Sequence, residues 1–286
     1  MQVIKEAFAY ADMIKIGHTL FALPFALAGL CLAWANGWTV DAFQIAMILV
    51  AFTAARAAAM GFNRIVDRRI DAKNPRTKMR PTVSGAISTN AAKFFTIFCS
   101  GIFIASAFAI NPLCGWLSFP ALAMLLGYSY SKRFTSASHL WLGLAISVAP
   151  TAAWIAASAT LDPRILTLSS ALLFQIAAFD VIYALQDIDF DKNYGLHSIP
   201  ARFGKDNALR IAAFMLVLAF LSLIASGYLF GLGIPYFACT ALIGAGYAFA
   251  IYSTKRFSAK KISDIFFYLN AGSSMLILAG SATALI

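Results

Sequence analysis

One stretch of the chain decides the fold: residues 42–71 read AFQIAMILVAFTAARAAAMGFNRIVDRRID. Its apolar part, 42–62, has about the 20 residues that a transmembrane helix needs. Asn63, Asp67 and Asp71 follow at intervals of four residues, so they lie along one face if the helix continues past residue 62. The stretch therefore predicts a membrane-spanning helix that carries carboxylates at one end.

The rest of the chain shares this apolar character. Of its 286 residues, 61% are hydrophobic and only 12% are charged, whereas roughly 25% of a typical soluble chain is charged. Because the apolar blocks are continuous, unlike the alternating strands of a barrel, we expect an all-α integral membrane protein that forms a single polytopic domain over residues 1–286. We predict a bundle of nine transmembrane helices, at 16–36, 42–62, 94–111, 113–129, 140–160, 165–185, 209–231, 234–252 and 265–285. Asn111-Pro112 is the predicted turn between the third and fourth spans.

The charge of the connecting segments alternates along the chain. Segments 36–41, 111–112 and 232–234 contain no Lys or Arg, and 159–164 contains only Arg164, whereas the other connections are basic. The positive-inside rule then predicts a cytoplasmic N-terminus, cytoplasmic basic loops and an outside C-terminus, in a bacterial-type inner or plasma membrane. This topology and an attraction to the anionic lipid bilayer account for the net charge of +10. We therefore expect no nucleic-acid partner, and the sequence does not indicate an oligomeric state.

A second acidic cluster repeats the pattern of the first. Asp187 and Asp191 are again four residues apart, at the end of the predicted sixth span, and Asp180 and Tyr183 extend that face into the span. Carboxylates in or beside a membrane are costly and usually functional. Two stripes of carboxylates suit a hard cation such as Mg²⁺, which takes oxygen ligands and commonly bridges to phosphates.

Basic side chains surround both clusters on the predicted cytoplasmic side. They lie between Arg64 and Arg80, and again at Lys132 and Arg133. For one such loop alone, a solvated loop with salt bridges is the simpler interpretation. The repeated spacing, 120 residues apart, instead favours a site in which metal ions hold an anion. Because an apolar bundle beside it could hold a long tail, we predict that the ligand is a lipid diphosphate.

Two other classes of membrane protein fit less well. An ion-coupled transporter would place its acidic residues near the membrane midplane, often at broken helices, whereas these lie at the predicted cytoplasmic edge apart from Asp180. A transferase of CDP-linked lipids would carry a D-G-x-x-A-R pattern, and this chain has none.

The acidic clusters resemble the two motifs of the UbiA superfamily of intramembrane prenyltransferases. The first motif is written N-D-x-x-D-x-x-x-D, and Asn63, Asp67 and Asp71 match it. The R-T-x-x-R-P sequence that follows it in the family is intact at 76–81. Asp187 and Asp191 match the second motif, D-x-x-x-D.

Further positions extend the resemblance. The sequence Tyr128-Ser-Tyr-Ser-Lys132-Arg133 is similar to a segment of 4-hydroxybenzoate polyprenyltransferases, and Arg56 matches an arginine that is common before the first motif. One position departs from the pattern, because Arg64 stands where the family has its first Asp.

The resemblance implies an enzyme, a polyprenyltransferase that uses Mg²⁺. Its substrates would be a polyprenyl diphosphate and an aromatic acid acceptor, 4-hydroxybenzoate or a similar acid, and the reaction would serve ubiquinone or menaquinone biosynthesis and release pyrophosphate. Acceptors of the futalosine-type menaquinone route, or of haem or chlorophyll synthesis, remain open. The polar loops 64–92 and 192–208 are expected to cap the site.

The resemblance, together with the two acidic faces, gives each candidate residue a role. The expected metal ligands are Asn63, Asp67, Asp71, Asp187 and Asp191, of which the four aspartates are also expected to be catalytic. The expected substrate-binding residues are Asn63, Arg56, Arg76, Arg80, Tyr128, Lys132, Arg133, Asp180 and Tyr183.

Overall fold

The computed structural model describes residues 2–254, 256 and 259–285, which form helices and no strand. The all-α membrane fold is therefore confirmed. Eight helices in the described ranges are long and apolar enough to cross a bilayer. The first predicted span, 16–36, is instead divided into the 3₁₀ helix η1 (Ile16–Phe21) and the short apolar helix α2 (Leu23–Ala35). Pro24 lies in the first turn of α2, where its missing N–H favours a new helix start. The count of nine spans stays a prediction.

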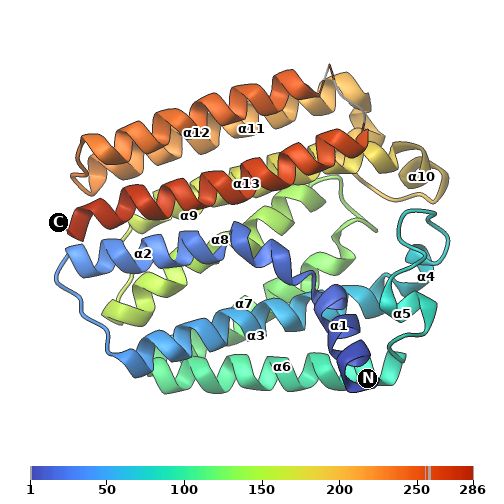
Figure 1. The fold of residues 1–286 in the computed structure, drawn as a ribbon, viewed down its shortest axis with the longest axis horizontal. Coiled ribbons are helices and arrows are strands. Elements are labelled where there is room, and N and C mark those ends of the chain that lie inside the picture. The colour runs from blue at the N-terminus through green and yellow to red at the C-terminus, as the bar shows by residue number, and fades with distance from the viewer. Residues whose placement is uncertain (1, 255, 257–258, 286) are drawn as a thin grey trace. The chain divides into compact units, whose positions relative to one another are not determined.

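The chain divides into two compact units. Figure 1 colours the chain by residue number, so the segments of each unit can be found with its colour bar. The first comprises residues 1–19 and 41–130, and the second comprises 20–40 and 131–286. The first unit contains α1 (Gln2–Ile14), α3 (Ala42–Val66), α4 (Arg68–Asp71), α5 (Pro81–Ser84), α6 (Thr89–Ile110) and α7 (Pro112–Ser131). The second contains α2, α8 (Ser138–Ser158), α9 (Ile165–Ala184), η2 (Leu185–Asp187), α10 (Ile188–Asn193), α11 (Ile199–Leu229), α12 (Ile234–Ser253), α13 (Ala259–Ala282) and η3 (Thr283–Leu285).

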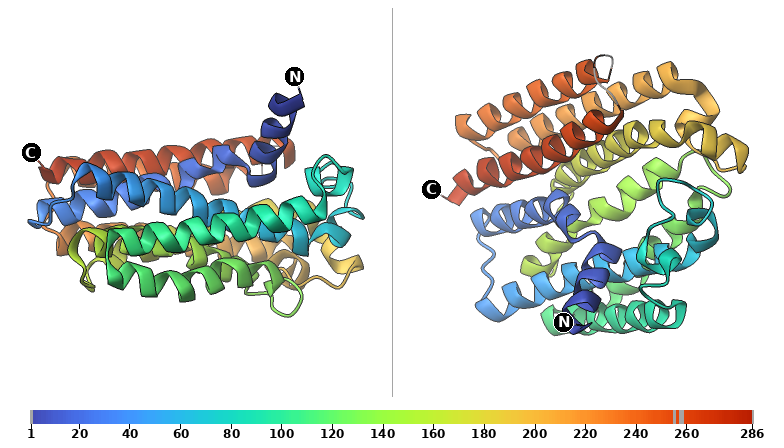
Figure 2. Two further views of the ribbon diagram at one scale, coloured as in Figure 1. Left: turned by 90° about the horizontal axis from the view of Figure 1, so that it is seen from below. Right: turned by 45° about the vertical axis from the view of Figure 1, so that its right-hand side comes forward.

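In the first unit, α3 and α6 pack lengthwise against each other (Figures 1 and 2). A Cβ atom on Gly61 of α3 would lie 2.6 Å from Thr96 Oγ1 of α6, so the missing side chain permits this close approach. The turn between α6 and α7 lies at Asn111-Pro112, as predicted. The Asn111 side-chain oxygen accepts the Cys114 N–H at 2.8 Å and caps the start of α7.

In the second unit, α9 packs between α8 and α11 and is the most buried of the spans. Gly143 of α8 allows close contact, because a Cβ atom there would lie 2.4 Å from the Leu173 carbonyl oxygen of α9. A buried polar network joins α9 to α12 and α13. Gln175 donates its amide to Asn270 Oδ1 at 2.5 Å and accepts the Tyr247 hydroxyl at 2.6 Å. Each of these buried polar groups therefore has a partner, as an apolar core requires.

We predict that Gly143→Ala destabilises the protein by about 1–3 kcal/mol, because the added methyl group overpacks the contact between α8 and α9. The measurement is the thermal unfolding midpoint of the detergent-purified chain, with Gly272→Ala as the matched control. A Cβ atom at Gly272 of α13 meets no atom within 4 Å, so the control should be neutral or stabilising. Equal midpoints for the two variants would contradict the close approach.

Candidate functional site

The first acidic cluster lies where α3 ends. α3 stops at Val66, Asp67 takes φ −87° and ψ 0°, and the one-turn helix α4 follows. The helix that carries Asn63 therefore continues past residue 62 but is interrupted at Asp67. The four-residue register nevertheless continues, because the Asp67 N–H donates to the Asn63 carbonyl at 2.9 Å and the Asp71 N–H donates to the Asp67 carbonyl at 2.8 Å.

Side-chain hydrogen bonds hold the first cluster in order. The Asn63 side-chain amide donates Nδ2–H to Asp67 Oδ2 at 2.8 Å. Its side-chain oxygen, Oδ1, accepts Arg64 Nη1–H at 3.1 Å. Asp71 is only 4% exposed, and Arg80 Nη1 lies 2.7 and 2.6 Å from its two carboxylate oxygens. Arg80 thus neutralises a carboxylate that burial would otherwise make costly.

Two arginines of α3 hold the C-terminal end of α1. Arg64 is buried and donates Nε–H to the Met13 carbonyl at 3.2 Å. Arg56, eight residues earlier, donates Nη2–H to the Lys15 carbonyl at 3.0 Å. Unpaired carbonyls at a helix C-terminus attract cations, so both arginines have a structural partner. Tyr128 lies near both guanidinium groups.

The second acidic cluster also follows a helix break. α9 ends at Ala184, and η2 and α10 carry the acidic residues beyond it. Asp187 and Asp191 are buried, whereas Asp189 between them is exposed. The Asp191 carboxyl lies beside Ser198 and interacts electrostatically with Lys132. Its Oδ2 atom is buried and has no protein partner.

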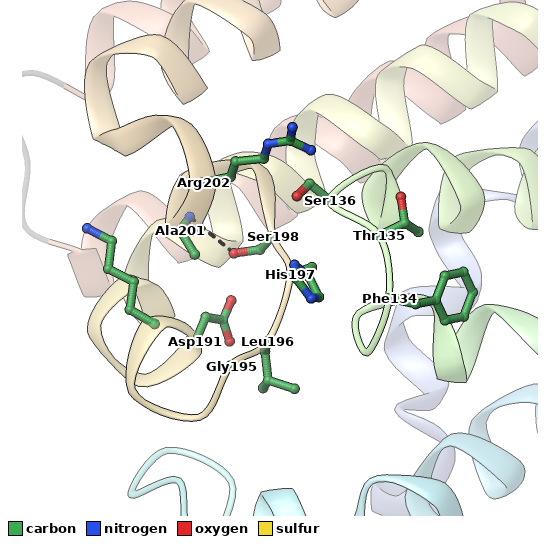
Figure 3. A pocket seen from close by; sticks show the side chains of 11 residues that line it. Phe134, Thr135, Ser136, Asp191, Gly195, Leu196, His197, Ser198, Ala201 and Arg202 are labelled. Atoms are coloured by element: carbon green, nitrogen blue, oxygen red, sulfur yellow. Dashed lines mark hydrogen bonds between the residues drawn. The ribbon is translucent and has the colours of Figure 1, made fainter.

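A cavity of about 450 Å³ opens beside Asp191, within the second unit (Figure 3). Ser136, His197, Ser198 and Arg202 are among the residues that line it. Ser136 is 6% exposed, and its hydroxyl oxygen has no hydrogen-bond partner. Two residues that line the cavity, Ser136 and Asp191, therefore each carry a buried oxygen without a protein hydrogen-bond partner.

The remaining expected residues lie in both units. Asp180 of α9 has its Oδ2 atom 2.6 Å from Nδ1 of His139, at the start of α8. Tyr183 is exposed, Arg133 is half-buried, and Arg76 is exposed in the loop between α4 and α5. The first unit contains Arg56, Asn63, Asp67, Asp71, Arg76, Arg80 and Tyr128, and the second contains Lys132, Arg133, Asp180, Tyr183, Asp187 and Asp191.

Sequence reasoning did not assign a site role to Ser136, His139, Ser198 or Arg202. Ser198 had one usable signal, because a serine before Ile-Pro is typical of a helix N-cap. Ser136, His139 and Arg202 had none, because their roles depend on contacts between segments that are about 60 residues apart.

Comparison with known proteins decides the family. The sequence matches the model of the UbiA prenyltransferase family over residues 22–272. The chain belongs to the UbiA prenyltransferase family. The 4-hydroxybenzoate octaprenyltransferase of Shewanella woodyi is 28% identical over 274 residues, 93% of this chain and 92% of the relative. The protein of the same name from Alcanivorax borkumensis is 30% identical over 242 residues, 84% of this chain and 82% of that one.

Solved structures of UbiA homologues share the fold. The apo structure of a homologue from Aeropyrum pernix K1 has a TM-score of 0.85 and 31% identity, over 94% of this chain and 98% of the homologue. A homologue from Archaeoglobus fulgidus bound to GPP and Mg²⁺ has a TM-score of 0.74 and 22% identity, over 97% of this chain and 99% of the homologue. This chain is therefore a multi-span membrane protein with the UbiA fold.

Replacement of Arg64 tests the anchor of α1. We predict that Arg64→Leu accelerates tryptic cleavage after Lys15 by about 10–100-fold, because a hydrogen bond from a charged group contributes about 1.5–3 kcal/mol. Arg69→Leu is the control, since Arg69 is also a motif arginine but is exposed. The measurement is the rate of appearance of the cleaved chain. Equal rates for the two variants would contradict an anchoring role for Arg64.

Proposed function

We propose that this chain transfers a polyprenyl group from a polyprenyl diphosphate to the ring of an aromatic acid, 4-hydroxybenzoate or a close analogue, and releases pyrophosphate. The observation that carries the proposal is Asp191. Its buried carboxylate has one oxygen without a protein partner, at the end of an apolar span and beside Lys132. Such an oxygen is suited to bind a metal ion whose remaining coordination positions are filled by a phosphate. The names of the curated relatives support the acceptor, and the homologue bound to GPP and Mg²⁺ supports the donor and the metal.

We propose that both acidic clusters hold Mg²⁺, with Asn63, Asp67 and Asp71 in one and Asp187 and Asp191 in the other. In the described ranges, no group of three or more His, Cys, Asp or Glu side chains is placed to hold a metal by itself. Mg²⁺ usually binds one or two carboxylates and completes its shell with water and substrate phosphates, so an acidic pair suits it. When bound, Mg²⁺ would neutralise the charge that develops on the departing pyrophosphate.

Basic side chains would bind the rest of the diphosphate. Lys132 already interacts with Asp191, so its ammonium group is suited to bind a phosphate held next to that carboxylate. Arg80 would donate to the diphosphate from its position on Asp71, and Arg76 would add an exposed guanidinium group from the same loop. Arg202 and the unpartnered Ser136 hydroxyl would bind the diphosphate from the cavity beside Asp191.

The acceptor needs a cationic partner for its carboxylate, and the reaction needs a site from which water is excluded. Arg133 would bind the acceptor carboxylate with two parallel hydrogen bonds. The aromatic faces of Tyr128 and Tyr183 would stabilise the allylic cation that forms when the C–O bond breaks, and the apolar spans would exclude water from it. A C–C bond then forms beside the ring hydroxyl and the ring proton leaves. Asp187 or Asp191 would assist loss of the phenol proton, and Asp180 and Arg56 would complete the substrate-binding set.

We further propose that the two units act as one domain in a bacterial-type inner or plasma membrane, with the N-terminus and the capping loops 64–92 and 192–208 on the cytoplasmic side and the C-terminus outside. The basic connections and the positive-inside rule support this orientation.

Asp191→Asn tests the assignment of the second cluster. The amide preserves shape but removes the anionic oxygen that a metal would need, so we predict at least about a 100-fold loss of transfer. Asp189→Asn is the matched control, because Asp189 lies on the same short helix but is exposed. The assay combines membranes, Mg²⁺, a labelled polyprenyl diphosphate and 4-hydroxybenzoate, and identifies the product by mass. Full transfer by the Asp191 variant would refute its metal role, and no transfer by the wild-type chain to any aromatic acid would refute the activity.

Single cysteines test the orientation. In a chain whose four native cysteines are replaced by alanine, Thr39→Cys and Ala86→Cys each add one thiol in an exposed connection. We predict that a membrane-impermeant maleimide labels Cys at 39 in intact cells, whereas Cys at 86 reacts only after lysis. The reverse pattern would place the capping loops outside.

A further inference from the structure

His139 lies at the start of α8 and is completely buried. Both of its ring nitrogens have partners. Nδ1 lies 2.6 Å from Oδ2 of Asp180, and Nε2 accepts the backbone N–H of Ile199 at 3.3 Å. A backbone N–H only donates, so Nε2 carries a lone pair and the proton is on Nδ1. The hydrogen bonds therefore select the neutral Nδ1–H tautomer of His139.

Ile199 is the first residue of α11, and the residue before it contacts Asp191. The Ser198 hydroxyl oxygen accepts the Ala201 N–H at 3.3 Å, which caps α11, and Ser198 also lies beside the Asp191 carboxyl in the wall of the same cavity. His139 thus binds the peptide N–H directly after Ser198, the serine that lies beside Asp191.

Two further bonds join the same segments. The Ser138 hydroxyl donates to the His197 carbonyl at 3.3 Å, and the His197 N–H donates to the Lys132 carbonyl at 2.7 Å. Residues 132–139 and 197–199 are therefore connected at three points, of which His139 is the most buried. Lys132 begins the first of these segments, and Asp191 lies six residues before the second.

We propose that His139 is a positioning residue that holds Asp191, through Ile199 and Ser198, in the place where it binds metal. This inference rests on the proposed function, because it assigns His139 a role in the Mg²⁺ and diphosphate site. The bond to Ile199 has this effect, whereas the bond to Asp180 fixes the ring tautomer. Loss of a residue that holds a metal ligand in place typically weakens metal binding about 10–100-fold.

The test measures binding of Mn²⁺, as a paramagnetic substitute for Mg²⁺, to the detergent-purified full chain with geranyl thiolodiphosphate present. Electron paramagnetic resonance gives the free Mn²⁺ and hence the apparent Kd. We expect His139→Ala to raise this Kd about 10-fold. His139→Gln should stay within about 3-fold of wild type, because its side-chain oxygen reaches the Ile199 N–H. His139→Asn keeps a donor to Asp180 but is too short to reach Ile199, so it should behave like His139→Ala.

Controls separate positioning from loss of fold. Ser147→Ala removes another buried side chain of α8, whose hydroxyl only bonds the Leu144 carbonyl, and should leave the Mn²⁺ Kd unchanged. Unchanged affinity in His139→Ala would overturn the inference, as would equal rescue by Gln and Asn. Absence of Mn²⁺ binding in the wild-type chain would instead overturn the proposed function.

The tautomer has its own readout. In a chain labelled with [¹⁵N]histidine, one residue should show a protonated Nδ1 and an unprotonated Nε2 at neutral pH, and this signal should be absent from His139→Gln. A protonated Nε2 at His139 would overturn the inference, because that nitrogen could not accept the Ile199 N–H.

Discussion

A carboxylate buried at the end of an apolar helix must have a partner for its charge, and this constraint organises both units. Taking one ion out of water costs several kcal/mol in real proteins. Asp71 meets the requirement through Arg80, and the partly buried Asp180 accepts a hydrogen bond from His139. Asp191 meets it only in part, with Ser198 and Lys132 nearby and one oxygen left over. We propose that metal and phosphate bind at the Asp191 oxygen that has no protein partner.

The helix breaks serve the same requirement. Beyond the break at Asp67 and the turn of 3₁₀ helix after Ala184, Asp71, Asp187 and Asp191 lie in buried positions. The backbone register of four residues survives the first break, so the aspartate spacing in the sequence remains meaningful.

Arg64 stands at the second position of the motif that this chain resembles, N-D-x-x-D-x-x-x-D, and the contacts with α1 show how it is accommodated. Its guanidinium group binds the Met13 carbonyl and the Asn63 side chain, while Arg56 binds the Lys15 carbonyl. Arg64 therefore replaces a family carboxylate with a cation that has its own partners. The acidic residues that we propose as ligands, Asp67 and Asp71, keep their places beside it.

The apolar blocks predicted the membrane helices well, because length and hydropathy are local properties of the sequence. Asn111-Pro112 correctly marked a turn for the same reason. The division of the first span at η1 was not predicted, since apolar residues on both sides hid the effect of Pro24. Whether the helix continues past residue 62 was left open, and in the structure it runs to Val66, with Asp67 keeping the hydrogen-bond register beyond the break. The roles of Arg56, Arg80 and His139 depend on partners that are distant in sequence or on folded loops, which spacing alone does not specify.

Asp187 and Asp191 of the second unit are proposed to act on one magnesium diphosphate, and a double-mutant cycle tests this most directly. The measurement is kcat/KM of Mg²⁺-dependent transfer for Asp187→Asn, Asp191→Asn and the double variant, each checked for intact fold by gel filtration. Residues that act as a unit are strongly non-additive, so we predict that the double variant is within about 10-fold of the slower single variant. Fold-losses that multiply in the double variant would contradict a shared metal–diphosphate site.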